Sequence, residues 1–221
     1  MNRRQPLAFA LVLAAVVASC ERRANLETSS DVSRSSEAPP DSAPVVVASS
    51  AGPRAPARVG MDTPSIATPR ELAELSAALD VPVQGVARQQ LRDTYAEPRA
   101  GHTHEALDIL AARGTPVLSA ASGRLLRMFD SKAGGLMVYA TDASERFILF
   151  YGHLDRYADG LRNGMPLARG QVIGYVGTTG NAPPGTPHLH FGILRGQPSV
   201  SWWTGVPVNP YPLLVAAGRS P

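Results

Sequence analysis

From about residue 82 onward, Gly and Pro recur at intervals of about eight to twelve residues, and the short segments between them are rich in Val, Leu, Ile, Tyr and Phe. Turn-forming residues this frequent leave no room for long helices and are typical of short strands joined by turns. The sequence therefore predicts a mainly β domain with antiparallel sheets. The expected strands are 116–120, 123–129, 136–141, 146–153, 171–176 and 188–194.

The chain before this region has a different composition. Residues 20–64 are rich in Ser, Ala, Pro and Arg, have almost no aromatic residues and show no sustained apolar period. Such a segment cannot bury enough surface to offset the entropy lost on ordering, so we expect a disordered Pro/Ala/Ser-rich tether. Residues 65–90 are expected to be a short helical lead-in, and 91–221 the folded domain.

A helix is expected to start at Thr68, which is followed by Pro69. A hydroxyl side chain at the N-cap and a proline at the first helical position are both common at helix starts. Leu72, Leu75 and Leu79 then fall on one face of a helix that ends before the proline at position 82.

Residues 1–19 have the three parts of an export signal: two arginines, an apolar run from 7 to 17, and the small residues Ala18 and Ser19. The apolar run is too short for a comfortable membrane span. Cys20, the single cysteine, follows at once, and Val17-Ala18-Ser19-Cys20 resembles the lipobox at which bacterial lipoproteins are cleaved and acylated. This predicts a lipid anchor on Cys20; the alternative is a leftover thiol in a cleaved signal peptide.

The residue after the cysteine bears on localisation. In lipoproteins an aspartate at this position often means retention in the inner membrane, and this chain has Glu21. We therefore expect an exported protein that is lipid-anchored in the cell envelope, in the outer membrane and facing the periplasm.

The charge of the chain is only slightly basic. There are 21 Lys and Arg residues against 18 Asp and Glu residues, which gives a formal net charge of +3. The basic residues are scattered rather than gathered in a run or interleaved with aromatic residues, so a nucleic-acid partner is not expected.

The five histidines all lie between residues 102 and 190. Two of them form the pair His188-Leu189-His190, and on a strand the side chains at i and i+2 project to the same face. Both imidazoles are therefore expected to share one pocket. The alternative is a pair of exposed polar residues on a half-buried strand.

His104 and Asp108 form a second pair, in His104-Glu105-Ala106-Leu107-Asp108. A hydrolytic zinc site needs three protein ligands and one open position, and this pair meets that count when His190 joins it. A spacing of four fits one face of a helix or a loop that runs into a strand. A rival interpretation is the helical HExxH motif with Glu105 as general base, but the segment 113–116 (Arg-Gly-Thr-Pro) would break that helix.

His153 follows an apolar run, in Tyr151-Gly152-His153-Leu154. It is expected at the end of a strand, on the same face as Tyr151. A lone histidine at a strand end is more often structural, and the two other histidine clusters are what make this one a candidate catalytic residue.

These motifs together resemble a known family. HxxxD at 104–108, YxHL at 151–154 and HLHF at 188–191 occur in the order found in the lysostaphin or LytM-type zinc metallopeptidases, which are peptidoglycan endopeptidases. The resemblance extends from about residue 93 to 214 and includes the phrases at 114–117, 170–174 and 177–180.

The resemblance implies a β-sheet domain of the duplicated hybrid motif type and one zinc ion bound by His104, Asp108 and His190. It implies that His153 and His188 act on water and stabilise the transition state. The implied substrate is a peptide cross-link or stem of peptidoglycan, and no protein partner is indicated.

Two departures from the family pattern stand out. Members usually have glycine where Ala106 stands, which alanine can replace only if the backbone there does not have a positive φ. The loop 181–186 before HLHF is long and rich in proline. Two alternative functions are a catalytically silent LytM-like regulator that activates a cell-wall amidase and a non-enzymatic wall-binding lipoprotein. Silent relatives typically lack metal ligands, and this chain has all of them.

Overall fold

A computed structural model describes residues 66–99, 101–198 and 201–216. The predicted signal peptide, Cys20 and the predicted tether lie outside these residues. Within the described part, no helix is long and apolar enough to cross a bilayer.

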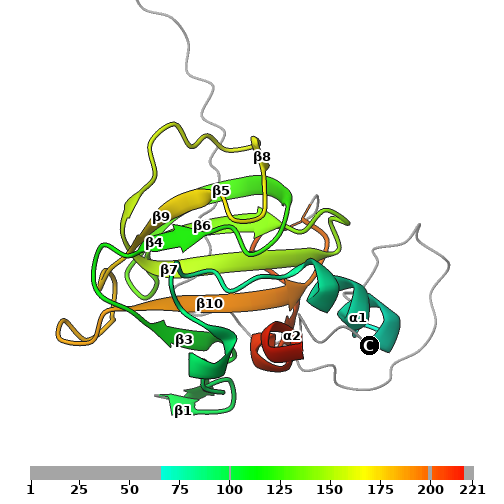
Figure 1. The fold of residues 1–221 in the computed structure, drawn as a ribbon, viewed down its shortest axis with the longest axis horizontal. Helices are drawn as coiled ribbons and strands as arrows, with labels where there is room; N and C mark the ends of the chain where they lie inside the picture. Colours follow the sequence, from blue (N-terminus) through cyan, green and yellow to red (C-terminus); the bar gives the residue numbers. More distant parts are fainter. Residues whose placement is uncertain (1–65, 100, 199–200, 217–221) are drawn as a thin grey trace, which may run out of the picture. The chain divides into compact units, whose positions relative to one another are not determined.

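Helix α1 (Pro69–Ala78) begins where the sequence predicts. The Thr68 hydroxyl accepts a hydrogen bond from the Glu71 backbone at 3.3 Å, and the Glu71 carboxylate accepts one from the Thr68 backbone at 2.9 Å. This reciprocal capping box satisfies two donors that a helix start otherwise leaves unpaired. The buried face of α1 packs beside helix α2 (Pro210–Ala216), and the Ser76 hydroxyl donates to the Leu213 carbonyl at 2.8 Å (Figure 1).

A nine-stranded antiparallel sheet forms the body of the fold. Its main path runs β11-β10-β7-β6-β5-β8 (Figure 1). Strand β3 pairs with the first half of β10, on the same edge as β11 and opposite β7, and β9 joins β7 to β4. The bounds are β3 (Leu107–Leu110), β4 (Pro116–Leu118), β5 (Gly123–Ser131), β6 (Gly135–Thr141), β7 (Phe147–Tyr157), β8 (Pro166–Leu167), β9 (Val172–Val176), β10 (His188–Arg195) and β11 (Val206–Val208). A separate hairpin, β1 (Pro98–Arg99) and β2 (His102–Thr103), and a 3-10 turn at Arg88–Gln90 complete the described elements.

One face of this sheet is the core, and the alternation along β10 shows which. Leu189, Phe191 and Ile193 are fully buried in the apolar cluster, whereas His188 and His190 fall between them in sequence and point to the opposite face. The predicted placement of both imidazoles on one face follows from this alternation.

The mainly β antiparallel fold is confirmed, and the six expected strands are all present. The largest difference is in β7, which continues past His153 to Tyr157, so the prediction that the strand ends at His153 is wrong. The pairing of β7 with β9 shifts register after Leu154, and this irregularity lets the strand continue beyond the histidine. The strands β1, β2, β3, β8 and β11 were not expected, because two to four residues are too few to show a period.

Candidate metal centre and its histidines

Two strands and one loop bring His104, Asp108 and His190 together. Asp108 on β3 lies directly opposite His190 on β10, and His104 lies in the loop between β2 and β3. Asp108 Oδ1 is 3.0 Å from His104 Nε2 and 3.2 Å from His190 Nδ1, and the two nitrogens are 3.1 Å apart. Of the two alternatives for the HxxxD spacing, the structure shows the loop that runs into a strand.

The donor set of this triad fits a metal ion. Ligands at about 2.0–2.1 Å from a tetrahedral zinc ion lie about 3.3 Å from one another, close to the three distances found here. His104 Nδ1 is 2.9 Å from the Thr94 carbonyl, which can only accept, so Nδ1 carries the proton in the neutral ring. The lone pair on Nε2 then faces the Asp108 carboxylate, and a bound cation would remove that repulsion.

His153 and His188 lie beside the triad and are both buried, each with 6% of its surface exposed. Their ring centroids are 4.9 Å apart, and the His153 ring is 5.4 Å from that of His190. His153 Nδ1 is 2.8 Å from the Thr179 carbonyl, and His188 Nδ1 is 2.8 Å from the Thr186 carbonyl. Since carbonyls only accept, both neutral rings keep a lone pair on Nε2. The five predicted site residues therefore form one cluster.

The backbone at His153 is in the left-handed region, with a φ of 58°. A non-glycine residue in this region costs on the order of 1–3 kcal/mol and persists where its surroundings hold it, often at functional sites. Here the His153 backbone N–H donates to the Gly134 carbonyl at 2.7 Å.

This backbone turn overturns the prediction that Tyr151 and His153 share a strand face. Tyr151 is buried in the core with its ring 5.2 Å from that of Phe191, and its hydroxyl accepts a hydrogen bond from the Ala120 backbone. The ring of His153 instead lies among the site histidines. The positive φ at His153 breaks the alternation on which the prediction rested.

Burial and neighbouring charges set the protonation of the cluster. Burial, with a smaller contribution from His190, lowers the pKa of His153 to about 4. Burial also lowers the pKa of His190. For Asp108, burial raises the pKa, but the combined hydrogen bonds and charges of His104 and His190 outweigh it and lower the pKa far below its usual range. Near neutral pH the Asp108 carboxylate is therefore charged, and the His153 and His190 rings are neutral.

The helical HExxH interpretation is wrong, because the segment from His104 to Asp108 contains no helix. Glu105 has a φ of 54°, and Ala106 is not among the residues with a positive φ. Alanine therefore replaces the usual glycine at 106 without strain, and its side chain is fully buried.

Several contacts of the site were not predicted from the sequence. Arg99 binds the second oxygen of Asp108 at 2.7 Å, and the Thr94 hydroxyl accepts a hydrogen bond from the Asp108 backbone at 2.9 Å. Thr179 and Thr186 contribute their backbone carbonyls, which any residue could supply. Only the phrase at 177–180, quoted for its family resemblance, marked one of these positions.

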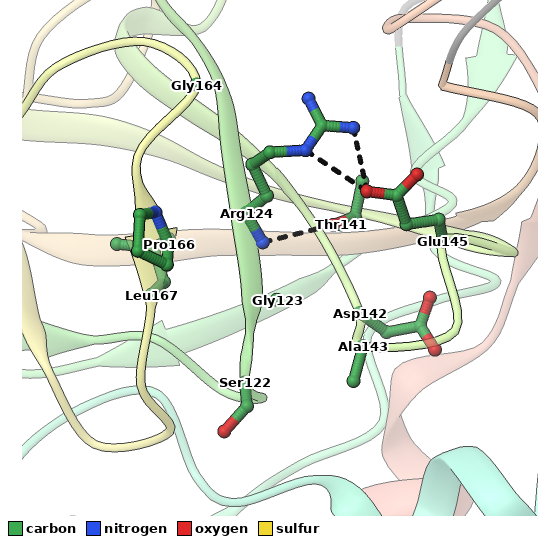
Figure 2. Close-up of a pocket in the computed structure, with 10 residues that line it drawn as sticks. All are labelled: Ser122, Gly123, Arg124, Thr141, Asp142, Ala143, Glu145, Gly164, Pro166 and Leu167. Atoms are coloured by element: carbon green, nitrogen blue, oxygen red, sulfur yellow. Dashed lines mark hydrogen bonds and ion pairs between the residues drawn. The ribbon is translucent and has the colours of Figure 1, made fainter.

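A separate hollow of about 420 Å³ lies away from this cluster, over Ser122 to Arg124 and the turn after β6 (Figure 2). Figure 2 shows Arg124 and Glu145 pointing toward each other in an ion pair of 2.8 Å. None of its lining residues is a histidine, and its two central charges satisfy each other. The hollow carries no catalytic constellation.

Comparison with known proteins places this region of the chain in a peptidase family. Residues 102–210 match the family model described as Peptidase family M23. The chain is 33% identical over 136 residues to the L-Ala--D-Glu endopeptidase of Bacillus subtilis (strain 168), covering 58% of this chain and 40% of that protein. It is 33% identical over 100 residues to the DD-carboxypeptidase/endopeptidase Mpg of Neisseria meningitidis serogroup B, covering 43% and 21%.

Among solved structures, lysostaphin from Staphylococcus simulans matches with 27% identity and a TM-score of 0.48, over 58% of this chain and 50% of that one. The matched part thus spans less than half the length of the curated relatives named above.

Proposed function

The chain belongs to peptidase family M23 through residues 102–210, and from this premise we propose that it is a zinc-dependent endopeptidase that hydrolyses peptide cross-links or stems of bacterial peptidoglycan. The observation that carries the proposal is the convergence of His104, Asp108 and His190 within 3.2 Å of one another, with two further histidines beside them. The curated relatives are named as endopeptidases, which supports peptide-bond hydrolysis.

His104 Nε2, His190 Nδ1 and Asp108 Oδ1 would hold the zinc ion. Three ligands leave a fourth position open, as in catalytic rather than structural zinc sites. When bound, zinc supplies the Lewis acidity that polarises a peptide carbonyl and makes water a nucleophile at neutral pH.

His153 and His188 are the proton-transfer groups of the proposed mechanism. Each donates Nδ1–H to a backbone carbonyl, which fixes the ring and leaves Nε2 to take a proton from water or to give one to the leaving amine. His188 Nε2 lies 3.6 Å from Asp108 Oδ1, which places this nitrogen at the edge of the ligand cluster. Once protonated, one of the two rings would also stabilise the negative charge that develops on the carbonyl oxygen.

The test is cleavage of purified peptidoglycan by the full chain in detergent, with the metal content measured in parallel and the fragments identified by mass spectrometry. We expect one zinc per chain and new peptide ends, which would name the bond that is cut. His188→Ala should keep the metal and release no fragments. Zinc without cleavage by the wild type would favour the amidase-activating regulator, and the absence of zinc would overturn the site.

We further propose that Cys20 carries a lipid anchor that holds the protein in the outer membrane, facing the periplasm. This rests on the sequence features of residues 1–21 alone. A tether of 45 residues from 20 to 64 would give the enzyme a reach of several tens of ångströms from the membrane to the wall. Metabolic labelling with a fatty acid tests the anchor: label on the wild type and none on Cys20→Ser is expected, and equal labelling would refute it.

A further inference from the structure

Arg99 connects a hairpin outside the main sheet to the candidate metal centre. It ends β1, where it pairs with His102 of β2, two residues before His104. Its guanidinium donates from Nη2 to Asp108 Oδ2 at 2.7 Å. The arginine side chain is 37% exposed and the aspartate side chain 19%, so this ion pair lies at the mouth of the site.

The two oxygens of Asp108 have different partners. Oδ1 faces His104 Nε2 at 3.0 Å and His190 Nδ1 at 3.2 Å, whereas Oδ2 faces away from them and binds Arg99. We propose that Arg99 is a positioning residue that keeps Asp108 a one-oxygen metal ligand. The inference rests on the zinc site of the proposed function but does not depend on which bond is hydrolysed.

The reason this matters is the number of open positions at the metal. Carboxylates bind metals through one oxygen or through both. A second oxygen from Asp108 would fill the position that a catalytic site leaves open for water or substrate. The charge-assisted hydrogen bond from Arg99 holds Oδ2 on the side of the guanidinium and so disfavours its turning toward the metal.

The local structure holds Arg99 in this place. Glu97 lies 3.3 Å from the same Nη2 atom and limits where the guanidinium can move. Two backbone hydrogen bonds tie the hairpin region to the ligand loop: His104 N–H to the Glu97 carbonyl and Glu105 N–H to the Tyr95 carbonyl, both at 2.9 Å. The arginine and the ligand it contacts are therefore positioned as one unit.

The coordination number is a better readout than metal affinity. A guanidinium repels a dication directly while it orients the carboxylate, so an affinity would mix two opposite effects. Cobalt(II) substitution separates them, because its visible absorption weakens as four-coordinate geometry becomes five-coordinate. The variants are Arg99→Met, which removes the charge, and Arg99→Lys, which keeps a donor within reach of the single contact to Oδ2.

In the full-length protein loaded with cobalt, we expect Arg99→Met to lose visible absorption intensity relative to wild type and Arg99→Lys to retain it. In the zinc form, Arg99→Met should lower kcat by about 10- to 100-fold, with partial recovery in Arg99→Lys. Arg70→Met is the matched control, because Arg70 is 89% exposed and forms an ion pair with Glu74 within α1, away from the metal ligands. It should leave both readouts unchanged.

An unchanged cobalt spectrum in Arg99→Met would overturn the proposal. If KM or kcat changed at the same time, Arg99 would be a substrate-contacting residue instead. The spectrum needs no substrate, so a wild-type protein that binds cobalt but cuts no peptidoglycan would refute the proposed function while still deciding the role of Arg99.

Discussion

The two halves of the site are held in place by different means. The triad of His104, Asp108 and His190 is fixed by strand pairing between β3 and β10 and by contacts among its own side chains. The pair of His153 and His188 is fixed by backbone carbonyls, at Thr179 and Thr186, and by a strained backbone at His153. Two of the three triad residues are thus held by strand pairing in the sheet, whereas the rings of the pair are oriented by carbonyls of the loop between β9 and β10.

This difference indicates which chemical role the triad and the pair can each have. Side chains that converge on one point, with the His104 Nε2 lone pair facing the Asp108 carboxylate, are suited to share a cation. Rings that are each tethered through one nitrogen and keep the other free are suited to exchange protons. Changes to the triad should therefore affect metal and activity together, and changes to the pair should affect activity alone.

The largest expected effect comes from removing a ligand. We predict that Asp108→Ala and His190→Ala each lose bound zinc and with it all measurable cleavage. The loss should exceed the roughly 10⁴-fold upper limit for a missing acid-base group, because water activation itself is lost. Zinc content by elemental analysis and cleavage of purified peptidoglycan measure both effects. A variant that kept one zinc per chain would break the assignment of that residue to the triad.

The next effect comes from the tethered pair. We predict that His153→Ala keeps one zinc per chain and lowers kcat by about 100- to 10,000-fold. The matched control is His102→Ala, because His102 lies on β2, is exposed and is not part of the cluster. It should keep both zinc and activity. Loss of zinc from His153→Ala would show that the two halves do not work separately.

The triad was easier to predict from the sequence than the pair's geometry. His190 follows from the alternation along β10, and His104 and Asp108 were identified by ligand type and by the family resemblance. The left-handed φ of His153 leaves no trace in the pattern of apolar residues. The sequence therefore could not show that β7 continues past His153, or that Tyr151 and His153 face different sides of the strand. Arg99 was missed because it lies in a hairpin of two-residue strands, which are too short to show a sequence period. Its contact with Asp108 therefore could not be predicted. The backbone carbonyls of Thr179 and Thr186 could be supplied by any residue, and only the family phrase at 177–180 marked one of the two positions.

A smaller effect should come from the loop that holds His153. Gly180 follows Thr179, has a φ of 72°, and a Cβ added to it would lie 2.3 Å from the Ala133 carbonyl oxygen and the Gly135 nitrogen. Gly160 has a φ of 76° and nothing within 4 Å of such a Cβ. Gly180→Ala should therefore destabilise the protein by about 1–3 kcal/mol more than Gly160→Ala, because only it adds overpacking to backbone strain.

The same two variants test the separation of the site halves. Gly180→Ala should also lower kcat, because it displaces the carbonyl that orients His153, while zinc content stays at one per chain. Urea unfolding and metal analysis give both readouts. Equal free energies of unfolding for the two variants would show that the loop yields without cost and that the pair is less firmly tethered than the structure indicates.

The smallest effect on the site is expected from a change in α1. This helix contacts the ends of β7 and β10 that lie away from the histidines, and these two strands carry residues of both halves of the site. Glu71 on α1 accepts hydrogen bonds from Arg195 of β10 at 3.0 Å and from Arg146 just before β7 at 3.4 Å. The Thr68 backbone hydrogen bond and, after it, Arg195 lower the pKa of Glu71 from 4.5 to about 2, against the opposing effect of burial. A carboxylate whose folded pKa is depressed adds stability above its unfolded pKa and loses it as pH falls through the folded value.

Glu71→Gln should therefore lower the free energy of unfolding at pH 7, and the gap to wild type should shrink between about pH 4.5 and pH 2. The unfolding curves are best measured on metal-free protein, so that acid release of zinc does not contribute. Because Glu71 supports the strands that carry both halves of the site without touching either, zinc content and kcat at neutral pH should not change. A gap that stayed constant across this pH range would mean that the Glu71 carboxylate does not stabilise the fold through its charge. A loss of zinc from Glu71→Gln would mean that the contacts of α1 with the far ends of β7 and β10 also help to position the metal ligands. The triad would then depend on α1 as well as on strand pairing.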